Sequence, residues 1–395
     1  MNYTEKLNPL VTGIAPSGIR KFFELANEMD DCISLGVGEP DFVTPWEVRD
    51  SAIKSLQAGK TQYTANAGLF ALRQRIAGYA YRRFNLSYEP KSEIIVTVGA
   101  SEAIDLALRT IVAYGDEVLI PAPSYVSYSP NVTIVGGVPI ALNLSGDNGF
   151  KLTASALKNA ITKKTKALIF PYPNNPTGAI MNREEMQEIA EVIVENDIMV
   201  ISDEIYAELT YGNARHASIA SIDGMRERTV VINGFSKSFA MTGWRLGYLC
   251  APKEITSQAY KIHQYTIMCA NTFAQYGALT ALENGEEDGY ETIEKMRDSY
   301  DMRRKYLYSE FTKMGLTCFQ PQGAFYIFPC VQKTGLDGEQ FAQRLLMEKR
   351  VAVVPGSAFG DAGKDYIRCC YATSLTDLKK AVERIREFMS ENGWL

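Results

Sequence analysis

Histidine is nearly absent from this chain. Only His216 and His263 occur among its 395 residues, which argues against a histidine-rich metal site and against a Ser-His-Asp catalytic arrangement. We therefore expect no bound metal. The seven cysteines are an odd number spread along the chain, and no Cys-x-x-Cys motif occurs. This usage is typical of reduced thiols in a reducing compartment rather than of a disulfide framework.

Long hydrophobic runs and clusters of like charge are also missing. No apolar run approaches the length of a membrane span, and the first residues, 1–6, lack the apolar core of a signal peptide. The net charge is −5, with lysine and arginine scattered along the chain, so no basic patch indicates nucleic-acid binding. We expect a cytoplasmic protein with no membrane and no nucleic-acid partner.

The chain is long enough for more than one domain. Single hydrophobic cores stop growing well below 395 residues. An acidic segment, Glu283–Gly289, is the expected break between domains. We predict a larger domain over residues 46–285 and a smaller domain made of residues 1–45 and 286–395.

Short apolar segments rich in β-branched residues alternate with segments of helical periodicity. This alternation predicts an α/β fold with a mostly parallel sheet. Ligands of such sheets bind beyond the carboxyl ends of the strands, so residues that follow strands are the candidate site residues. The expected strands are 94–97, 117–120, 167–170, 198–202, 229–232 and 246–250.

Lys237 follows one of these predicted strands. The strands on both sides of it are typical of a buried sheet, where an ammonium group is costly unless it is neutralised or covalently modified. Buried lysines of this kind form Schiff bases with carbonyl compounds. A loop lysine with its tip in water is the alternative, and the lysine alone favours it. Arg245, eight positions later, is a candidate ligand for a phosphate. Because of Arg245, we favour the Schiff-base role of Lys237 over the loop role.

A second feature indicates a bound anion. The predicted strand 94–97 and a predicted helix, 101–112, are joined by the short turn Val98-Gly99-Ala100-Ser101. The free amide groups and the dipole at a helix start both favour an anion at the same point. Many strand-to-helix turns look alike, so the turn indicates a phosphate site only together with Lys237 and Arg245.

The residues around Lys237 resemble the lysine signature of the class I aminotransferases. These enzymes use pyridoxal 5'-phosphate (PLP) on the fold-type I scaffold. The resemblance implies a three-layer α/β/α large domain with a mostly parallel sheet and a smaller α/β domain. It also implies that Lys237 carries PLP and then acts as the general base. The matching segment is Ser236-Lys237-x-x-x-x-Thr242-Gly243-Trp244-Arg245-x-Gly247.

The resemblance implies contacts to the PLP ring from residues that follow other predicted strands. Tyr125 is expected to cover the ring, and Asn175 and Tyr206 to contact its phenolic oxygen. Asp203 is expected to keep the ring nitrogen protonated, with Glu204 facing away. The alternatives are a core role for Tyr125, a plain turn around Asn175 and a helix cap at Asp203.

The resemblance also implies how the phosphate is held. Many relatives have a serine three positions before the lysine, where this chain has Gly234, so Ser236 is expected to replace it. Tyr63 is expected to contact the phosphate of a neighbouring subunit, which implies a homodimer with shared active sites; a surface tyrosine is the alternative. The expected phosphate ligands within one chain are Gly99, Ala100, Ser101, Ser236 and Arg245.

Three residues are expected to bind the substrate: Gly38, Asn175 and Arg368. Arg368 lies in an apolar segment, and its planar fork suits a carboxylate. It matches the family arginine that binds the α-carboxylate, and an internal salt bridge is the alternative. The backbone at Gly38 is expected to approach the same carboxylate. The pocket for the substrate side chain is expected around residues 14–17 and in the partner subunit, and no second arginine for a dicarboxylate is evident.

These inferences predict an aminotransferase with Lys237, Asp203 and Tyr206 as catalytic residues. It is expected to move an amino group from an L-amino acid to a 2-oxo acid, with 2-oxoglutarate as acceptor, by a ping-pong mechanism. Aromatic or broadly varied amino donors are favoured. A carbon–sulfur β-lyase of the cystathionine β-lyase type is the alternative enzyme. A PLP-binding regulatory protein is the alternative from another class, but no helix-turn-helix segment supports it.

Overall fold

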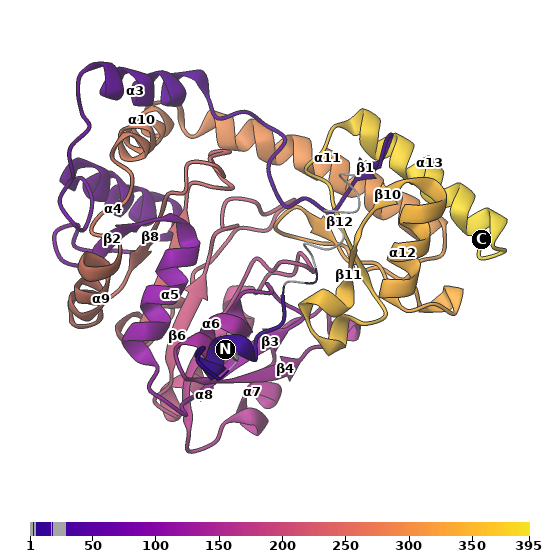
Figure 1. Ribbon diagram of the computed structural model, residues 1–395, viewed down its shortest axis with the longest axis horizontal. Coiled ribbons are helices and arrows are strands. Elements are labelled where there is room, and N and C mark those ends of the chain that lie inside the picture. The colour runs from indigo at the N-terminus through magenta and orange to yellow at the C-terminus, as the bar shows by residue number, and fades with distance from the viewer. Residues whose placement is uncertain (1–2, 4, 17, 19–28) are drawn as a thin grey trace.

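The computed structural model describes residues 3, 5–16, 18 and 29–395. Figure 1 shows a larger lobe, which holds the strands from β2 to β8, and a smaller lobe, which holds β10 to β12 with the helices α12 and α13. The long helix α11 leads from the larger lobe toward the smaller one. The strand β1 lies in the smaller lobe, and from there the chain passes to the larger lobe at α3 and returns to the smaller lobe through α11.

A seven-stranded sheet forms the centre of the larger lobe. Its strand order is β2-β8-β7-β6-β5-β3-β4. The neighbouring pairs from β4 to β7 are parallel, whereas β8 is antiparallel to both β7 and β2. The mostly parallel sheet predicted from the sequence is therefore confirmed. The strands are β2 (Ile94–Thr97), β3 (Glu117–Ala122), β4 (Val138–Asn143), β5 (Thr165–Phe170), β6 (Met199–Asp203), β7 (Thr229–Gly234) and β8 (Gly247–Cys250).

Helices cover both faces of this sheet. In β5, Ala167 and Ile169 pack in a cluster with α5, α6 and α9, whereas Leu168 and Phe170 pack in a second cluster with α7 and α8. Successive residues of a strand point to opposite faces, so the sheet is buried between two helical layers. The helices α3, α4 and α10 cover the β2 and β8 end of the sheet. The three-layer α/β/α architecture is confirmed.

The smaller lobe is built on a three-stranded antiparallel sheet in the order β11-β12-β9. The helices α11, α12 and α13 contribute to its core. The strand β1 pairs in parallel with β10, which fixes the segment after β1 beside this lobe. The strands are β1 (Ile33–Ser34), β9 (Tyr326–Ile327), β10 (Val351–Ala352), β11 (Val354–Pro355) and β12 (Ile367–Cys370).

The described helices of both lobes have the following bounds. They are α1 (Pro9–Thr12), α3 (Trp46–Gln57), α4 (Phe70–Phe84), α5 (Gly99–Ile111), α6 (Tyr128–Ile134), α7 (Ala154–Ala160), α8 (Arg183–Glu195), α9 (Lys253–Thr266), α10 (Thr272–Asp288), α11 (Glu291–Lys313), α12 (Gly338–Lys349) and α13 (Leu375–Glu391).

The acidic segment expected to be a break is helical instead. Residues up to Asp288 continue α10, which ends at Gly289 in a left-handed conformation with φ +70°. Arg75 of α4 forms ion pairs with Glu283 and Glu286, which explains how this acidic run is accommodated in a helix. The division of the chain into two domains at residue 285 stays a prediction.

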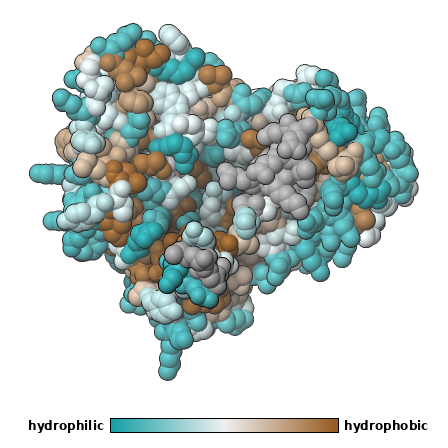
Figure 2. Space-filling view, viewed as in Figure 1, coloured by the Kyte–Doolittle hydropathy of each residue, from teal (hydrophilic) through white to brown (hydrophobic). Residues whose placement is uncertain are grey.

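The surface differs between the lobes. Figure 2 shows hydrophobic residues gathered on the larger lobe, whereas the smaller lobe is mainly hydrophilic on the side shown. Trp46 and Leu56 of α3 and Phe70 and Tyr81 of α4 are among the exposed hydrophobic residues. Within the described part of the chain, none of the helices combines the length and the apolar character that crossing a membrane requires.

Candidate active site

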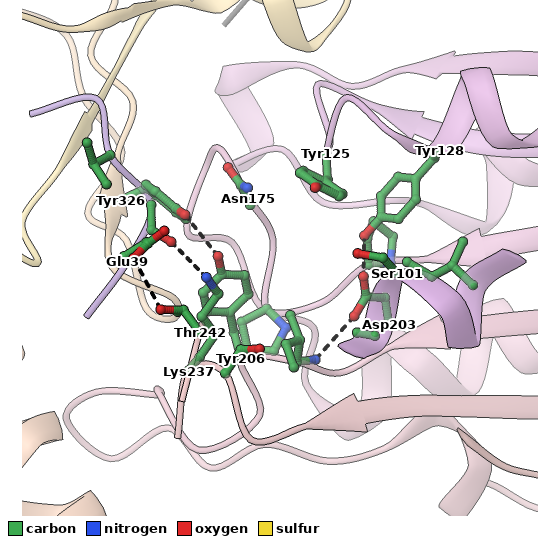
Figure 3. A pocket seen from close by; sticks show the side chains of 18 of the residues that line it. Glu39, Ser101, Tyr125, Tyr128, Asn175, Asp203, Tyr206, Lys237, Thr242 and Tyr326 are labelled. Carbon is green, nitrogen blue, oxygen red and sulfur yellow. Dashed lines mark hydrogen bonds between the residues drawn. The ribbon is translucent and has the colours of Figure 1, made fainter. Parts of the chain in front are cut away.

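A cavity of about 650 Å3 lies at the carboxyl ends of the parallel strands. Residues of both lobes line it, with Asp203 and Lys237 on one side and Tyr326 and Arg368 on the other. Figure 3 shows several of these side chains converging on one space. The predicted site residues in the lining are Gly38, Ala100, Ser101, Tyr125, Asn175, Asp203, Tyr206, Ser236, Lys237, Arg245 and Arg368.

Lys237 follows β7 and extends into this cavity. Its Nζ atom donates a hydrogen bond of 2.7 Å to the backbone carbonyl oxygen of Gly38. The ring centroids of Tyr206 and Phe325 lie 5.9 and 5.7 Å from Nζ. Burial lowers the pKa of Lys237 to about 8, although the Glu39 carboxylate opposes the shift. An appreciable fraction of the amine is therefore neutral near physiological pH, as a nucleophile or a general base requires.

Asp203 ends β6 and is 6% exposed. Its Oδ2 accepts a hydrogen bond of 2.7 Å from the Tyr128 hydroxyl, and its Oδ1 accepts one of 3.3 Å from the amide of Ile205. Burial raises the pKa of Asp203, whereas the bond from Tyr128 lowers it. No lysine or arginine within the described ranges forms an ion pair with this carboxylate. A buried carboxylate without a cation suits a protonated ligand nitrogen.

Arg245 and the start of α5 form an anion site. The helix begins at Gly99, where the first amide groups have no partner within the helix. A Cβ atom at Gly99 would lie 2.7 Å from Nη2 of Arg245, and Gly99 has φ +70°. Gly99 therefore lies directly beside the guanidinium, although it does not line the cavity itself. Arg245 is exposed, donates to the carbonyl oxygen of Thr242 at 3.2 Å, and has no carboxylate partner among the described residues. A free guanidinium beside a helix start suits a phosphate.

Gly234 has a packing reason to be a glycine. A Cβ atom there would lie 2.9 Å from Cα of Gly247 and 3.0 Å from the carbonyl oxygen of Leu246. A serine at this position would therefore push β7 and β8 apart. Ser236, two positions later, is 6% exposed and lines the cavity. Its role as the replacement phosphate ligand stays a prediction.

Arg368 lies on β12 and is 3% exposed. Its Nη1 donates to Oδ1 of Asn175 at 2.9 Å, and its Nη2 donates to the carbonyl oxygen of Gly36 at 2.5 Å. The guanidinium carbon lies 4.4 Å from the ring centroid of Tyr326, and Nε has no hydrogen-bond partner among the residues that the structure describes. The internal salt bridge considered from the sequence is not found among the described residues.

Tyr206 and Tyr326 pair through their hydroxyl groups at 2.9 Å (Figure 3). Tyr326 also explains the residue type at Gly38, because a Cβ atom there would lie 2.3 Å from the Tyr326 hydroxyl. The backbone of the segment after β1 therefore lies directly against Tyr326 at the cavity, and its approach to the substrate carboxylate stays a prediction.

Two predicted positions lie apart from the cavity. Tyr63 is 79% exposed and does not line it, so a contact to a neighbouring subunit stays a prediction. Of the residues expected to surround the substrate side chain, 14–16 are not in the lining, and Ser17 lies outside the described residues.

Comparison with known proteins places the chain in a family. The model of the family described as aminotransferase class I and II matches residues 30–385. The chain belongs to this family. It is 46% identical to the aspartate aminotransferase of Pyrococcus abyssi (strain GE5 / Orsay), over 96% of this chain and 97% of that protein. It is 42% identical to aromatic-amino-acid aminotransferase 2 of Thermococcus litoralis, over 96% of this chain and 97% of that protein. The crystal structure of the aromatic aminotransferase from Pyrococcus horikoshii OT3 matches with a TM-score of 0.90 at 44% identity, and the match covers 95% of this chain and 100% of that chain.

Class I aminotransferases depend on PLP, so PLP is the cofactor of this aminotransferase. The residues present fit the group. Arg245 beside the start of α5 offers a site for the phosphate, and Asp203 is a buried carboxylate that forms no ion pair with a lysine or arginine of the described residues. Lys237, whose pKa is lowered, offers an amine to the aldehyde carbon.

The lining residues that were not predicted from the sequence include Tyr128 and Tyr326, which both bond predicted site residues. Tyr128 bonds Asp203, and Tyr326 bonds Tyr206. A weak signal existed for Tyr326, because a hydroxyl within the apolar segment 324–328 needs a partner. Tyr128 stands only three positions after Tyr125, but no local pattern relates it to Asp203.

Proposed function

We propose that this aminotransferase moves the amino group of an L-amino acid to 2-oxoglutarate in the two half-reactions of a ping-pong mechanism. One observation carries the proposal: Lys237 and Arg368 line the same cavity, and Arg368 has no carboxylate partner among the described residues. Amino-group transfer requires an amine that moves a proton and a cation that holds the adjacent carboxylate.

Arg368 is proposed to bind the α-carboxylate of the substrate. Asn175 and the carbonyl oxygen of Gly36 each accept one hydrogen bond from its Nη atoms, so the fork is oriented before the substrate enters. Each Nη atom retains a second N–H, and two parallel donors suit a bidentate carboxylate. This preorganisation fixes the substrate Cα relative to Lys237.

Lys237 is proposed to move the proton. Bound PLP supplies an electron-withdrawing ring that accepts the electrons released when the Cα–H bond breaks. Nζ of Lys237 takes the Cα proton, and burial favours the neutral form of the amine that this step needs. The Asp203 carboxylate would hold a proton on the ring nitrogen of the cofactor. Arg245 and the start of α5 would hold its phosphate.

The donor is proposed to be aromatic or to come from a broad range. The lining includes apolar surfaces from Val37, Ile104 and Tyr125. The lining cations among the described residues are Lys237, Arg245 and Arg368, and each has a role above, so none remains for a second carboxylate. The two relatives named above are an aspartate and an aromatic-amino-acid aminotransferase, so membership in the family leaves the donor open.

A panel of amino donors tests this proposal. Purified protein with PLP and 2-oxoglutarate is expected to form glutamate from L-phenylalanine and L-tyrosine with a higher kcat/KM than from L-aspartate. Parallel double-reciprocal lines and stoichiometric release of a 2-oxo acid without acceptor would support the ping-pong order. Release of pyruvate from cystathionine without any 2-oxo acid would favour a β-lyase instead.

The assembly and the compartment are part of the proposal. Exposed hydrophobic residues on α3 and α4 suit contact with a second copy of the chain, and the partner's Tyr63 would reach the phosphate. All seven cysteines are free thiols, which suits the cytoplasm.

Mixing Lys237→Ala chains with Tyr63→Ala chains tests whether the active sites are shared between the two subunits. A hybrid dimer with shared sites contains one intact site, so the mixture should exceed either variant alone; sites confined to one chain would give no gain.

A further inference from the structure

We propose that Tyr128 is a positioning residue, whose hydroxyl orients the Asp203 carboxylate toward the cofactor. This inference rests on the proposed role of Asp203 opposite the ring nitrogen. Tyr128 opens α6 and lines the cavity together with Asp203. Figure 3 shows its hydroxyl directed at that carboxylate.

The contact between the two side chains is short and buried. The Tyr128 hydroxyl donates to Oδ2 of Asp203 at 2.7 Å. The side chains are 3% and 6% exposed, so water does not replace this bond readily. The other hydrogen bond to the carboxylate comes from the backbone of Ile205 and is longer, at 3.3 Å. Within the described part of the chain, Tyr128 is therefore the side-chain donor to Asp203.

The direction of the hydrogen bond favours a charged carboxylate. Asp203 has no lysine or arginine partner among the described residues, and burial alone disfavours its ionised form. A hydroxyl that donates to one oxygen stabilises the carboxylate and fixes its plane. An ionised and oriented Asp203 is what a protonated ring nitrogen requires, so Tyr128 acts through Asp203 rather than by touching the reacting atoms.

The ring of Tyr128 has a separate contact. It packs edge-on against Tyr125, with ring centroids 5.6 Å apart and an interplanar angle of 82°. Tyr125 is the residue expected to cover the cofactor ring. A Tyr128→Phe substitution keeps this aromatic contact and removes only the hydroxyl, so it isolates the bond to Asp203.

The first experiment measures the dissociation constant of PLP, kcat and the KM for the amino donor in the Tyr128→Phe protein. We expect PLP affinity and kcat each to fall roughly tenfold, as for the loss of a hydrogen bond to a charged group. The KM should change little, because Arg368 binds the carboxylate. Tyr88→Phe is the matched control: Tyr88 is buried, its hydroxyl has no hydrogen-bond partner in the described part of the chain, and it does not line the cavity. It should leave all three quantities unchanged.

A double-mutant cycle distinguishes positioning through Asp203 from a general packing effect. In an Asp203→Asn background, Tyr128→Phe should change PLP affinity by less than about twofold, because the two substitutions remove one interaction. An equal effect of Tyr128→Phe in both backgrounds would overturn the proposal. So would a strong effect of Asp203→Asn with none from Tyr128→Phe, and in that case the proposed function stands. If Asp203→Asn itself leaves PLP affinity and kcat unchanged, the role of Asp203 fails and the proposal fails with it.

Discussion

The carbonyl oxygen of Gly38 accepts a hydrogen bond of 2.7 Å from Nζ of Lys237. Gly38 follows β1, which pairs with β10 in the smaller lobe, whereas Lys237 follows β7 in the larger sheet. This hydrogen bond therefore joins the two lobes across the cavity, as do the bond from Arg368 to Asn175 and the bond between Tyr206 and Tyr326. The amine that is proposed to carry PLP is thus already directed toward the segment that is proposed to meet the substrate carboxylate.

The buried amine of Lys237 should make cofactor incorporation depend on pH. Its pKa is lowered to about 8 from the ordinary value of 10.5, and only the neutral amine attacks an aldehyde. The rate at which the cofactor-free protein incorporates PLP should rise with pH up to about 8 and then level off. Stopped-flow absorbance measurements would show this profile, and a rate that keeps rising to pH 10 would contradict it.

The same shift should appear in the stability of the cofactor-free protein. Between pH 8 and 10.5 the unfolded chain keeps a proton on Lys237 that the folded chain has lost, so the free energy of unfolding should rise with pH across this window. Denaturant titrations at several pH values measure it. Lys237→Met should remove this component of the pH dependence; an identical profile in that variant would show that other groups cause it.

Gly99→Ala should weaken PLP binding through Arg245. The new Cβ atom would lie 2.7 Å from Nη2 of Arg245 and should displace the guanidinium from the phosphate site. Gly59→Ala is a matched control, since Gly59 has the same φ of +70° but no atom of the described residues lies within 4 Å of the added Cβ. Both variants should lose about 1 kcal/mol of stability from backbone strain. Only Gly99→Ala should raise the dissociation constant of PLP, and equal affinities would refute the phosphate assignment.

Arg368→Lys should impair substrate binding more than folding. Lysine keeps the charge but loses the planar fork that contacts Asn175 and Gly36. We expect the KM for amino donors and for 2-oxoglutarate to rise roughly 10- to 100-fold, the range for lost hydrogen bonds to a charged group. Because every substrate carries the same carboxylate, the factor should be similar across donors. Steady-state kinetics on the donor panel measure it, and a factor that depends on the donor side chain would reassign Arg368 to the side-chain pocket.

His263 should stabilise the start of α5. Its Nδ1 lies 2.6 Å from Oε1 of Glu102 and its Nε2 lies 2.8 Å from the carbonyl oxygen of Asn66, and the side chain is fully buried. Glu102 also accepts the amide of Val98 at 2.5 Å, directly before the helix. His263→Ala should cost about 2–4 kcal/mol of stability, because it leaves a cavity and removes the hydrogen-bond partner of Oε1 of Glu102. Denaturant unfolding measures this loss, and a change below about 0.5 kcal/mol would contradict it.

The site residues that could be predicted from the sequence are those whose neighbouring residues indicate their position in the fold. Asp203 ends a buried strand, whereas Lys237 and Asn175 follow buried strands. The carboxyl ends of parallel strands meet at one edge of the sheet. Their placement in one cavity therefore follows from the alternation of strands and helices. The Tyr128 hydroxyl could not be assigned in this way, because its partner Asp203 lies 75 positions later in the chain. Such a contact depends on how α6 packs, which no local pattern specifies.

Elements of the fold could likewise be predicted where the local sequence determines them, but not where they depend on contacts with distant segments. The strands buried on both faces were recognised from their apolar runs, whereas β4 was missed because most of its residues, from Val138 to Asn143, are exposed or only partly buried. The acidic run at the end of α10 was not recognised as helical, since the ion pairs that Arg75 forms with it come from a separate helix. Sequence alone gives the charges but not their partners.

Covalent trapping of the cofactor tests the central claim most directly. The holoprotein would be reduced with borohydride, digested, and analysed by mass spectrometry. We predict that the phosphopyridoxyl label lies on the peptide that contains Lys237, and that Lys237→Ala acquires no label and no transaminase activity. A label on a different lysine, or full activity in the Lys237→Ala protein, would contradict the account.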